Sequence, residues 1–388
     1  MRICILKESL KIGGNERSAA NMSKLLSDNN DVYVVLFDAE NITYTYGGEL
    51  YDLALPPKVT MIGKIYNSFL RSTSLKKFLC EKQIDVIYMF TRIANYQTQQ
   101  KFKNVIKIIS ARDFASIENN HHSYNKALKN SDAMICNSEY IRSFYLSIYP
   151  EDKDKVFSVY NIVNTEEIVQ QSADEVEIEF VNFIKKHNKT ISAVGRFCKA
   201  KGFEYLLEAF AKASNRIDLG LIMVGDGDYK KKYEEIIKNH KIEDRVYFTG
   251  FQNNPYKYMK YTDIFVLSSL SEGFPNVVAE AMSLGLPIIA TNCHSGPAEI
   301  LRDDCNYNAV TNKLDKCDYG ILTPRITDSN NQAAIDELSE AIVYLANNKK
   351  LLEELSALSK QRAREYSPCI VAEKIKGILE VLGERKIR

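Results

Sequence analysis

The sequence has no surplus of either charge, no long apolar run and no closely paired cysteines. Its 388 residues carry a formal net charge of +1, so no overall positive field points to nucleic acid as a partner. Nowhere do about 18 apolar residues run together, as a membrane-spanning helix requires. The apolar run before Lys7 and Glu8 is too short for a signal peptide. We therefore expect a soluble, cytoplasmic chain.

Two further absences narrow the class of protein. The eight cysteines form no C-x-x-C pair, so we expect reduced thiols and neither disulfides nor a zinc site. A complete G-x-G-x-x-G dinucleotide fingerprint is also missing. The first loop offers only Gly13-Gly14, and the second half of the chain opens with Gly195-Arg196. These loops disfavour a nicotinamide-dependent dehydrogenase.

Two series of alternating strands and helices make up most of the chain. With 388 residues, 45% of them hydrophobic, length favours two domains. Alternation of this kind predicts the α/β class, with parallel sheets covered by helices on both faces. We expect a first domain over 1–185 and a second over 186–388, with Asn161–Asn188, which contains an acidic run, as the connection between them. The predicted strands are Arg2–Lys7, Val32–Phe37, Asp85–Phe90, Val105–Ser110, Ala133–Asn137, Val156–Tyr160, Thr190–Arg196, Leu219–Gly225, Arg245–Gly250 and Asp263–Ser268.

The strongest chemical signal lies in Ser269–Pro287. Gly273 permits close approach of the backbone to a ligand, and the helix predicted after it begins with unpaired N–H groups at a positive dipole end. Such a helix start binds anions. Glu280 lies in a mostly apolar helix and needs a donor such as sugar hydroxyls. Together with Glu272, it brackets a phosphate-sized site, which suits a sugar joined to a phosphate. The alternative is that both glutamates are solvated surface acids.

Two basic residues follow the first predicted strand of the second half. Arg196 stands at the strand's end, and Lys201 precedes Gly202 and a helix. Arginine offers a planar fork to phosphate oxygens and lysine a point charge. Both residues therefore suit a diphosphate, and the alternative is a solvated loop.

The patterns S-x-x-E-G-F-P-N-x-x-x-E-A-M at 269–282 and G-R-x-x-x-x-K-G at 195–202 resemble those of retaining glycosyltransferases of family 4. That family has the GT-B fold, in which two Rossmann-like doubly wound domains face each other across a cleft. The resemblance also implies that the last helix, about 369–388, crosses back to the first domain. The resemblance implies that Glu272 contacts the transferred sugar and Glu280 the ribose. It implies a diphosphate site formed by Gly14, Arg196, Lys201, Gly273, Phe274 and Asn276, with Phe251 at the nucleobase edge and Glu299 near the diphosphate.

The activity implied by the resemblance is transfer of a hexose or N-acetylhexosamine from a nucleotide diphosphate sugar, in particular a UDP-sugar. The acceptor would be a hydroxyl of a glycan or lipid-linked molecule, the linkage alpha, and the product a capsule or O-antigen polysaccharide. The nucleotide sugar is a substrate, so no cofactor is expected. The sequence offers no nucleophile poised by a base, and we expect electrostatic catalysis by Glu272, Arg196 and Lys201. A nucleotide-sugar epimerase and a non-catalytic nucleotide-sugar-binding protein are the alternatives.

The segment Val224–Asp228 has two interpretations, a metal site and a tight turn. Asp226 and Asp228 carry carboxylates that suit Mg²⁺ or Mn²⁺. The G-D-G sequence also fits a tight turn, and basic residues already supply positive charge. We expect that no metal ion is required.

Two segments of the first half have open alternatives. Arg112 and Asp113 end a strand where open α/β sheets bind ligands, at a place where relatives often carry a histidine that touches the sugar. They form either part of the acceptor site or a structural salt bridge. The basic, aromatic-bearing stretch 64–82 is either a solvated helix face or a patch that touches anionic lipid at the cytoplasmic face of a membrane.

Overall fold

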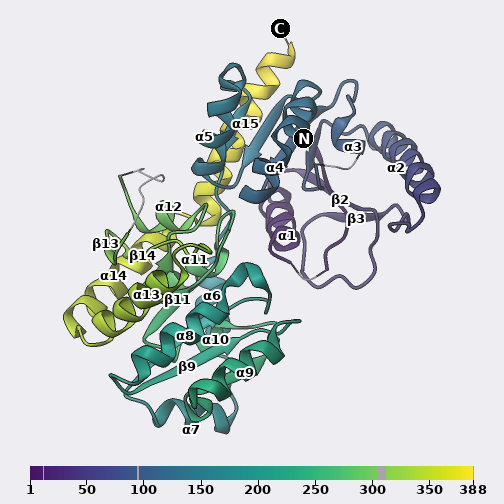
Figure 1. Cartoon of the computed structure of the whole chain (residues 1–388). Helices are drawn as coiled ribbons and strands as arrows, with labels where there is room; N and C mark the ends of the chain where they lie inside the picture. The colour runs from purple at the N-terminus through teal and green to yellow at the C-terminus, as the bar shows by residue number, and fades with distance from the viewer. Residues whose placement is uncertain (12, 94–95, 305–311, 388) are drawn as a thin grey trace. The chain divides into compact units, whose positions relative to one another are not determined.

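The computed structural model describes residues 1–11, 13–93, 96–304 and 312–387. The chain divides into two compact units. The first contains Met1–Ile162 and the C-terminal segment that begins at Pro368, and the second contains Val163–Ser367. Helix α15 (Pro368–Ile387) therefore belongs to the first unit, on which the sequence placed it as a crossing helix (Figure 1).

The first unit is built on a seven-stranded sheet whose neighbouring strands all run parallel. Apolar, β-branched runs form its strands, because a parallel sheet is covered on both faces. In spatial order the strands are β3 (Glu49–Asp52), β2 (Asp31–Leu36), β1 (Arg2–Lys7), β4 (Val86–Met89), β5 (Ile106–Ala111), β6 (Ala133–Cys136) and β7 (Val156–Ser158).

Helices cover both faces of this sheet and bury two apolar layers. One layer joins strand residues to Leu75, Ile117 and Ile141 of the helices on that face. The other joins them to Met22 and to Ile375, so that α15 completes the core of the first unit. The helices of this unit are α1 (Gly14–Ser27), α2 (Met61–Glu81), α3 (Tyr96–Gln99), α4 (Phe114–Lys129), α5 (Glu139–Ile148) and α15.

The second unit also contains a seven-stranded sheet. Its strands are parallel except at one edge, where β13 pairs antiparallel with β14. In spatial order they are β10 (Val246–Gly250), β9 (Leu219–Val224), β8 (Lys189–Val194), β11 (Ile264–Leu267), β12 (Ile288–Thr291), β14 (Gly320–Thr323) and β13 (Asp315–Cys317). Two doubly wound units confirm the predicted α/β fold class.

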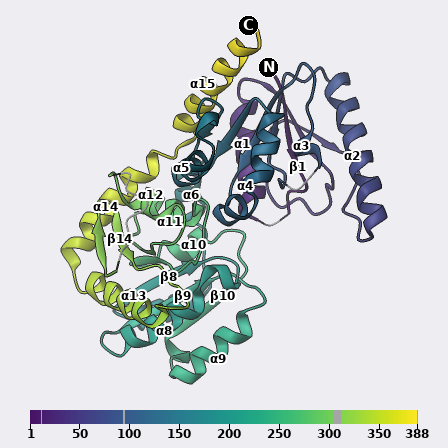
Figure 2. The ribbon, with the colours of Figure 1, turned by 45° about the horizontal axis from the view of Figure 1, so that its top comes forward.

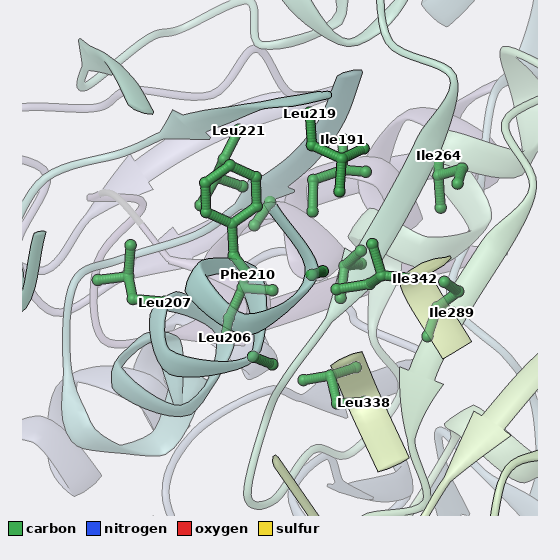
Figure 3. Packing of buried hydrophobic residues seen from close by; sticks show 14 of the residues in the cluster. Ile191, Leu206, Leu207, Phe210, Leu219, Leu221, Ile264, Ile289, Leu338 and Ile342 are labelled. Atoms are coloured by element: carbon green, nitrogen blue, oxygen red, sulfur yellow. The ribbon is translucent and has the colours of Figure 1, made fainter. Parts of the chain in front are cut away.

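The core of the second unit lies between the sheet and the helices of one face. Figure 3 shows the ring of Phe210 directed from its helix toward Leu221 of a strand, and Leu338 and Ile342 belong to the same cluster. On the other face Phe180 packs against Tyr258, with ring centroids 5.0 Å apart. The helices are α6 (Thr165–Ser172), α7 (Ile178–Lys185), α8 (Phe203–Ser214), α9 (Lys230–His240), α10 (Tyr256–Met259), α11 (Asn276–Ser283), α12 (Pro297–Leu301), α13 (Asn331–Ala346) and α14 (Lys349–Arg364).

The division between the units differs from the boundary expected after residue 185. The segment taken for a connection contains α6 and α7, and both pack on the second unit. Phe180 and Phe183 of α7 are buried there, and Thr165 of α6 hydrogen-bonds Ser283 of α11 (3.2 Å between the hydroxyls). The apolar face of α7 is short and follows an acidic run, which explains why its pattern resembled a linker. No helix in the described parts of the chain is long and apolar enough to cross a bilayer.

Candidate active site

The predicted site residues of the second unit gather where the order of its strands reverses. Strands β10, β9 and β8 lie on one side of this point, and β11 and β12 lie on the other. In open α/β sheets ligands bind beyond the carboxyl ends of the strands at such a switch point. The loop after β8 carries Arg196 and Lys201, and the loop after β11 carries Glu272. The candidate site therefore occupies the position that the topology favours.

The two loops are joined by close backbone packing at Gly202. This residue has φ +60°, and a Cβ atom there would collide with the carbonyl oxygen of Ser268. The hydroxyl of Ser268 donates to the Lys201 carbonyl (2.9 Å), and the Leu270 N–H donates to the Ala200 carbonyl (2.8 Å). A glycine is thus required for the β8 loop to lie against the β11 loop.

The central contact of the site joins Lys201 to Glu272. The Lys201 ammonium donates to Glu272 Oε1 at 2.7 Å, and the Ser269 hydroxyl donates to the same oxygen at 2.6 Å. Burial disfavours the charged ammonium, but attraction to the Glu272 carboxylate outweighs it and raises the pKa of Lys201. The Lys201 side chain is therefore charged near neutral pH.

The start of α11 is open to an anion. Pro275 occupies the N-cap position, and no side chain caps the helix. The preceding backbone is held firmly, because Phe274 is buried against Tyr366 (ring centroids 5.1 Å apart) and Ser295 Oγ donates to the Gly273 carbonyl at 2.7 Å. Asn276 is the first helical residue. This gives a fixed N-terminus whose positive dipole end favours negative charge.

A third loop, between β12 and α12, holds the backbone of Glu272 through hydrogen bonds. The Glu272 N–H donates to the His294 carbonyl (2.7 Å), and the Ser295 N–H donates to the Glu272 carbonyl (3.1 Å). The His294 ring contacts the Arg325 guanidinium. Burial, and secondarily the nearby Arg325 charge, lower the pKa of His294 to about 4, so its imidazole is neutral at physiological pH. Glu299 lies in the helix that follows and is buried.

The other residues of this unit that the sequence predicts to bind the nucleotide sugar differ in solvent exposure. Glu280 on α11 is 6% exposed. Arg196 is exposed in the β8 loop, and Phe251, which follows β10, is 49% exposed. The guanidinium of Arg196 and the ring of Phe251 are open to solvent, and only a small part of Glu280 is.

The G-D-G segment is a close backbone crossing. Gly225 and Gly227 have φ values of +146° and +152°, and a Cβ at either would collide with the loop that contains Gly195 and Phe197. Asp226 Oδ1 accepts from the Gly227 N–H at 2.8 Å. Among the described residues no group of three or more His, Cys, Asp or Glu side chains could hold a metal ion. The packing explains these glycines without a ligand.

The other predicted residues lie in the first unit. Gly14 begins α1, and a Cβ there would meet no atom within 4 Å. The Arg112 guanidinium donates to Asn161 Oδ1 at 2.8 Å and lies over the ring of Phe90. Burial lowers the pKa of Arg112. Asp113 caps α4, accepting the Ser116 N–H at 2.7 Å. Both Arg112 and Asp113 thus have structural contacts, and their acceptor role stays a prediction.

Sequence reasoning missed the residues that hold Glu272 in place. Ser269 forms part of the S-x-x-E pattern, so its spacing of three residues from Glu272 was a usable signal. Ser295 and Arg325 lie far from Glu272 in sequence, and no local pattern links them to it.

Residues 174–317 match the family model described as glycosyl transferases group 1. An uncharacterized glycosyltransferase of Methanocaldococcus jannaschii is 32% identical over 42% of this chain and 40% of its own length. A Campylobacter jejuni protein is 27% identical over 71% of this chain and 76% of its own length. It is named N-acetylgalactosamine-N,N'-diacetylbacillosaminyl-diphospho-undecaprenol 4-alpha-N-acetylgalactosaminyltransferase. The chain thus covers less than half of the first relative and about three quarters of the second.

Solved structures share the whole fold. The Anabaena protein HepE, in complex with UDP and glucose, superimposes with a TM-score of 0.75 at 18% identity, covering 98% of this chain and all of that one. Sucrose-phosphate synthase of Thermosynechococcus elongatus also gives 0.75, at 15% identity, covering 99% of this chain and all of that one.

Residues 174–317 thus resemble group 1 glycosyl transferases, and the fold of the chain is that of solved structures of the GT-B type, which confirms the predicted fold. The narrower assignment to family 4 stays a prediction.

Proposed function

We propose that the protein transfers a hexose or N-acetylhexosamine from a UDP-sugar to a hydroxyl of a glycan or lipid-linked acceptor, with retention of the alpha configuration. The observation that carries this proposal is the 2.7 Å contact between Lys201 and Glu272 beside the uncapped start of α11. It puts a fixed ammonium, a carboxylate and the positive dipole end of a helix within one loop cluster. A sugar diphosphate needs all three: donors for its phosphates and an acceptor for its hydroxyls.

The proposed chemistry is electrostatic. As the bond between the anomeric carbon and the β-phosphate oxygen breaks, the electron pair goes to the leaving diphosphate. Arg196, Lys201 and the N–H groups at the start of α11 stabilise that charge. The freed phosphate oxygen takes the proton of the acceptor hydroxyl as the new glycosidic bond forms on the same face of the sugar. Glu272 holds the sugar, Glu280 the ribose, and Phe251 lies at the nucleobase edge of the donor site.

The similarities support the choice of donor and acceptor. HepE was solved with UDP and glucose, and the Campylobacter relative is named for transfer to a diphospho-undecaprenol-linked sugar. We extend both features to this chain and place it at the cytoplasmic face of a membrane, in the assembly of a surface polysaccharide. No metal ion is required in this proposal, because fixed cations and a helix dipole neutralise the diphosphate.

A donor panel tests the proposal without knowledge of the acceptor. Purified protein is incubated with UDP-, GDP- and dTDP-sugars, and slow donor hydrolysis is followed in the presence of excess chelator. We expect release of UDP from one or a few UDP-sugars, unaffected by the chelator. A nucleotide sugar with altered stereochemistry and no released UDP would indicate the epimerase instead. Binding of UDP-sugar with neither product would indicate the non-catalytic alternative.

A further inference from the structure

Helix α2 presents an apolar face that the described residues of the first unit leave exposed. Its N-terminal half exposes Met61 (81%), Ile62 (84%), Ile65 (69%), Tyr66 (64%) and Phe69 (65%). At 100° per residue these five side chains occupy an arc of about 140° on one side of the helix. Exposed apolar patches of this kind mark interaction surfaces, because a soluble surface rarely gathers so many large apolar side chains.

The helix is anchored so that this face stays outward. Its C-terminal half buries Leu75, Phe78 and Leu79 in the first unit, and the Phe78 ring lies 4.5 Å from that of Tyr51. Nearer its start, Asn67 Nδ2 donates to the Pro56 carbonyl at 2.8 Å. Figures 1 and 2 show α2 at the outer rim of the first unit. One half of the helix therefore holds it to the core, and the other presents its apolar side chains.

Positive charge surrounds the apolar face. Lys58 and Lys64 are exposed beside it, and Lys76 and Lys77 are exposed further along the helix, at angles that continue the same arc. The single acid of α2, Glu81, stands at the far end, 3.7 Å from Lys77. The arrangement of large apolar side chains with flanking lysines is that of a helix lying in the surface of an anionic bilayer.

We propose that α2, with the preceding Lys58 and Val59, docks the protein on membranes that contain anionic lipid. The apolar side chains enter the boundary between headgroups and acyl chains, and the lysines contact the headgroup phosphates. Segment 54–60 and α2 also border a groove of about 460 Å³, lined largely by apolar side chains and continuous with this face. A second copy of the chain fits the face less well, because pairing would bring lysines against lysines. This proposal goes beyond the sugar transfer and does not depend on the donor chemistry.

Vesicle co-sedimentation tests the apolar part of the surface. The full chain is mixed with phosphatidylcholine vesicles that contain or lack phosphatidylglycerol, and we expect binding only to the anionic vesicles. Ile65→Asp should weaken that binding by about tenfold or more, since it removes a large buried side chain from the bilayer. The matched control is Ile178→Asp on α7, where an isoleucine of similar exposure (63%) lies outside the surface and should have no effect. Equal loss in both variants, or no binding by the unchanged protein, would overturn the proposal.

Charge reversal tests the electrostatic part. Lys64→Glu should weaken binding to anionic vesicles by about fivefold or more, and added salt should weaken binding by the unchanged protein. Lys349→Glu, at a lysine side chain that is 90% exposed on α14, is the matched control. Because all these side chains are exposed, the variants should keep the thermal midpoint of the unchanged protein.

A fluorescent probe can report docking directly, because the chain contains no tryptophan. Phe69→Trp introduces a single indole on the proposed surface, and its emission should shift to the blue when anionic vesicles are added. An unshifted emission, together with concentration-dependent self-association that Ile65→Asp abolishes, would show instead that a second copy of the chain covers this face.

Discussion

At the scale of single residues, Lys201 and Arg196 play different parts although both are cations of one loop. Lys201 is paired with Glu272 in this structure, whereas Arg196 is exposed. In the proposed mechanism, an incoming diphosphate therefore meets the guanidinium first and must share the ammonium with a carboxylate already bound to it. The Ser269 hydroxyl keeps that carboxylate in place.

Lys201→Ala and Arg196→Ala should each lower turnover of the donor about 100-fold or more, because each removes a charge that stabilises the leaving diphosphate. Steady-state kinetics with the donor found in the panel give the measurement. Lys199→Ala, at an exposed lysine of the same loop, is the control and should retain normal turnover. Circular dichroism checks that each variant is folded. Near-normal activity in both of the first two variants would contradict the electrostatic mechanism.

At the scale of elements, the glycine at the start of α8 determines how closely two loops approach. Gly202→Ala should lower the free energy of unfolding by more than the roughly 1–2 kcal/mol that a left-handed backbone costs an alanine, because the new methyl group also collides with the Ser268 carbonyl. Urea unfolding gives the measurement. Gly250→Ala is the matched control: Gly250 has φ +71°, yet a Cβ there meets nothing within 4 Å. Equal losses in the two variants would show that the contact with Ser268 has no energetic weight.

Individual strands and loops show which parts of the fold and of the candidate site could be predicted from the sequence and which could not. Strand β1 was predicted with the bounds it has, because Ile3–Leu6 is an uninterrupted apolar run between the charged residues Arg2 and Lys7. Strand β3 was missed, since its four residues are mostly exposed at the sheet edge and show no apolar pattern. The two loops with Lys201 and Glu272 lie together, because neighbouring parallel strands end at the same edge. Their support by Ser295 depends on a third strand, and only folding brings it near.

At the scale of the molecule, the first unit depends on the last helix of the chain. Ile375 and Leu379 of α15 are buried in its core with Ile3 and Tyr88. The whole helix buries at least four large apolar side chains, each worth about 1.5–3 kcal/mol, against a typical domain stability of about 5–15 kcal/mol.

Ile375→Asp should therefore abolish or strongly lower the thermal transition of the first unit, and removal of 368–388 should do so completely. Differential scanning calorimetry gives the measurement. The control is Lys376→Asp, since the neighbouring Lys376 side chain is 78% exposed and its change should leave the transition in place. The isolated segment 163–367 should still unfold cooperatively, because its core contains no residue of α15. A first unit that melts normally without α15 would contradict its part in the core.

The two ends of the second unit lie side by side, because the Val163 N–H donates to the Tyr366 carbonyl at 2.9 Å. This unit is therefore an insertion that leaves the first unit after Ile162 and returns to it at Pro368, through adjacent junctions. A domain is most readily inserted into another domain when its two ends lie close together. Recombination at this one pair of junctions could exchange the entire 163–367 cassette for that of a relative, and such chimeras would reveal which half of the chain selects the donor.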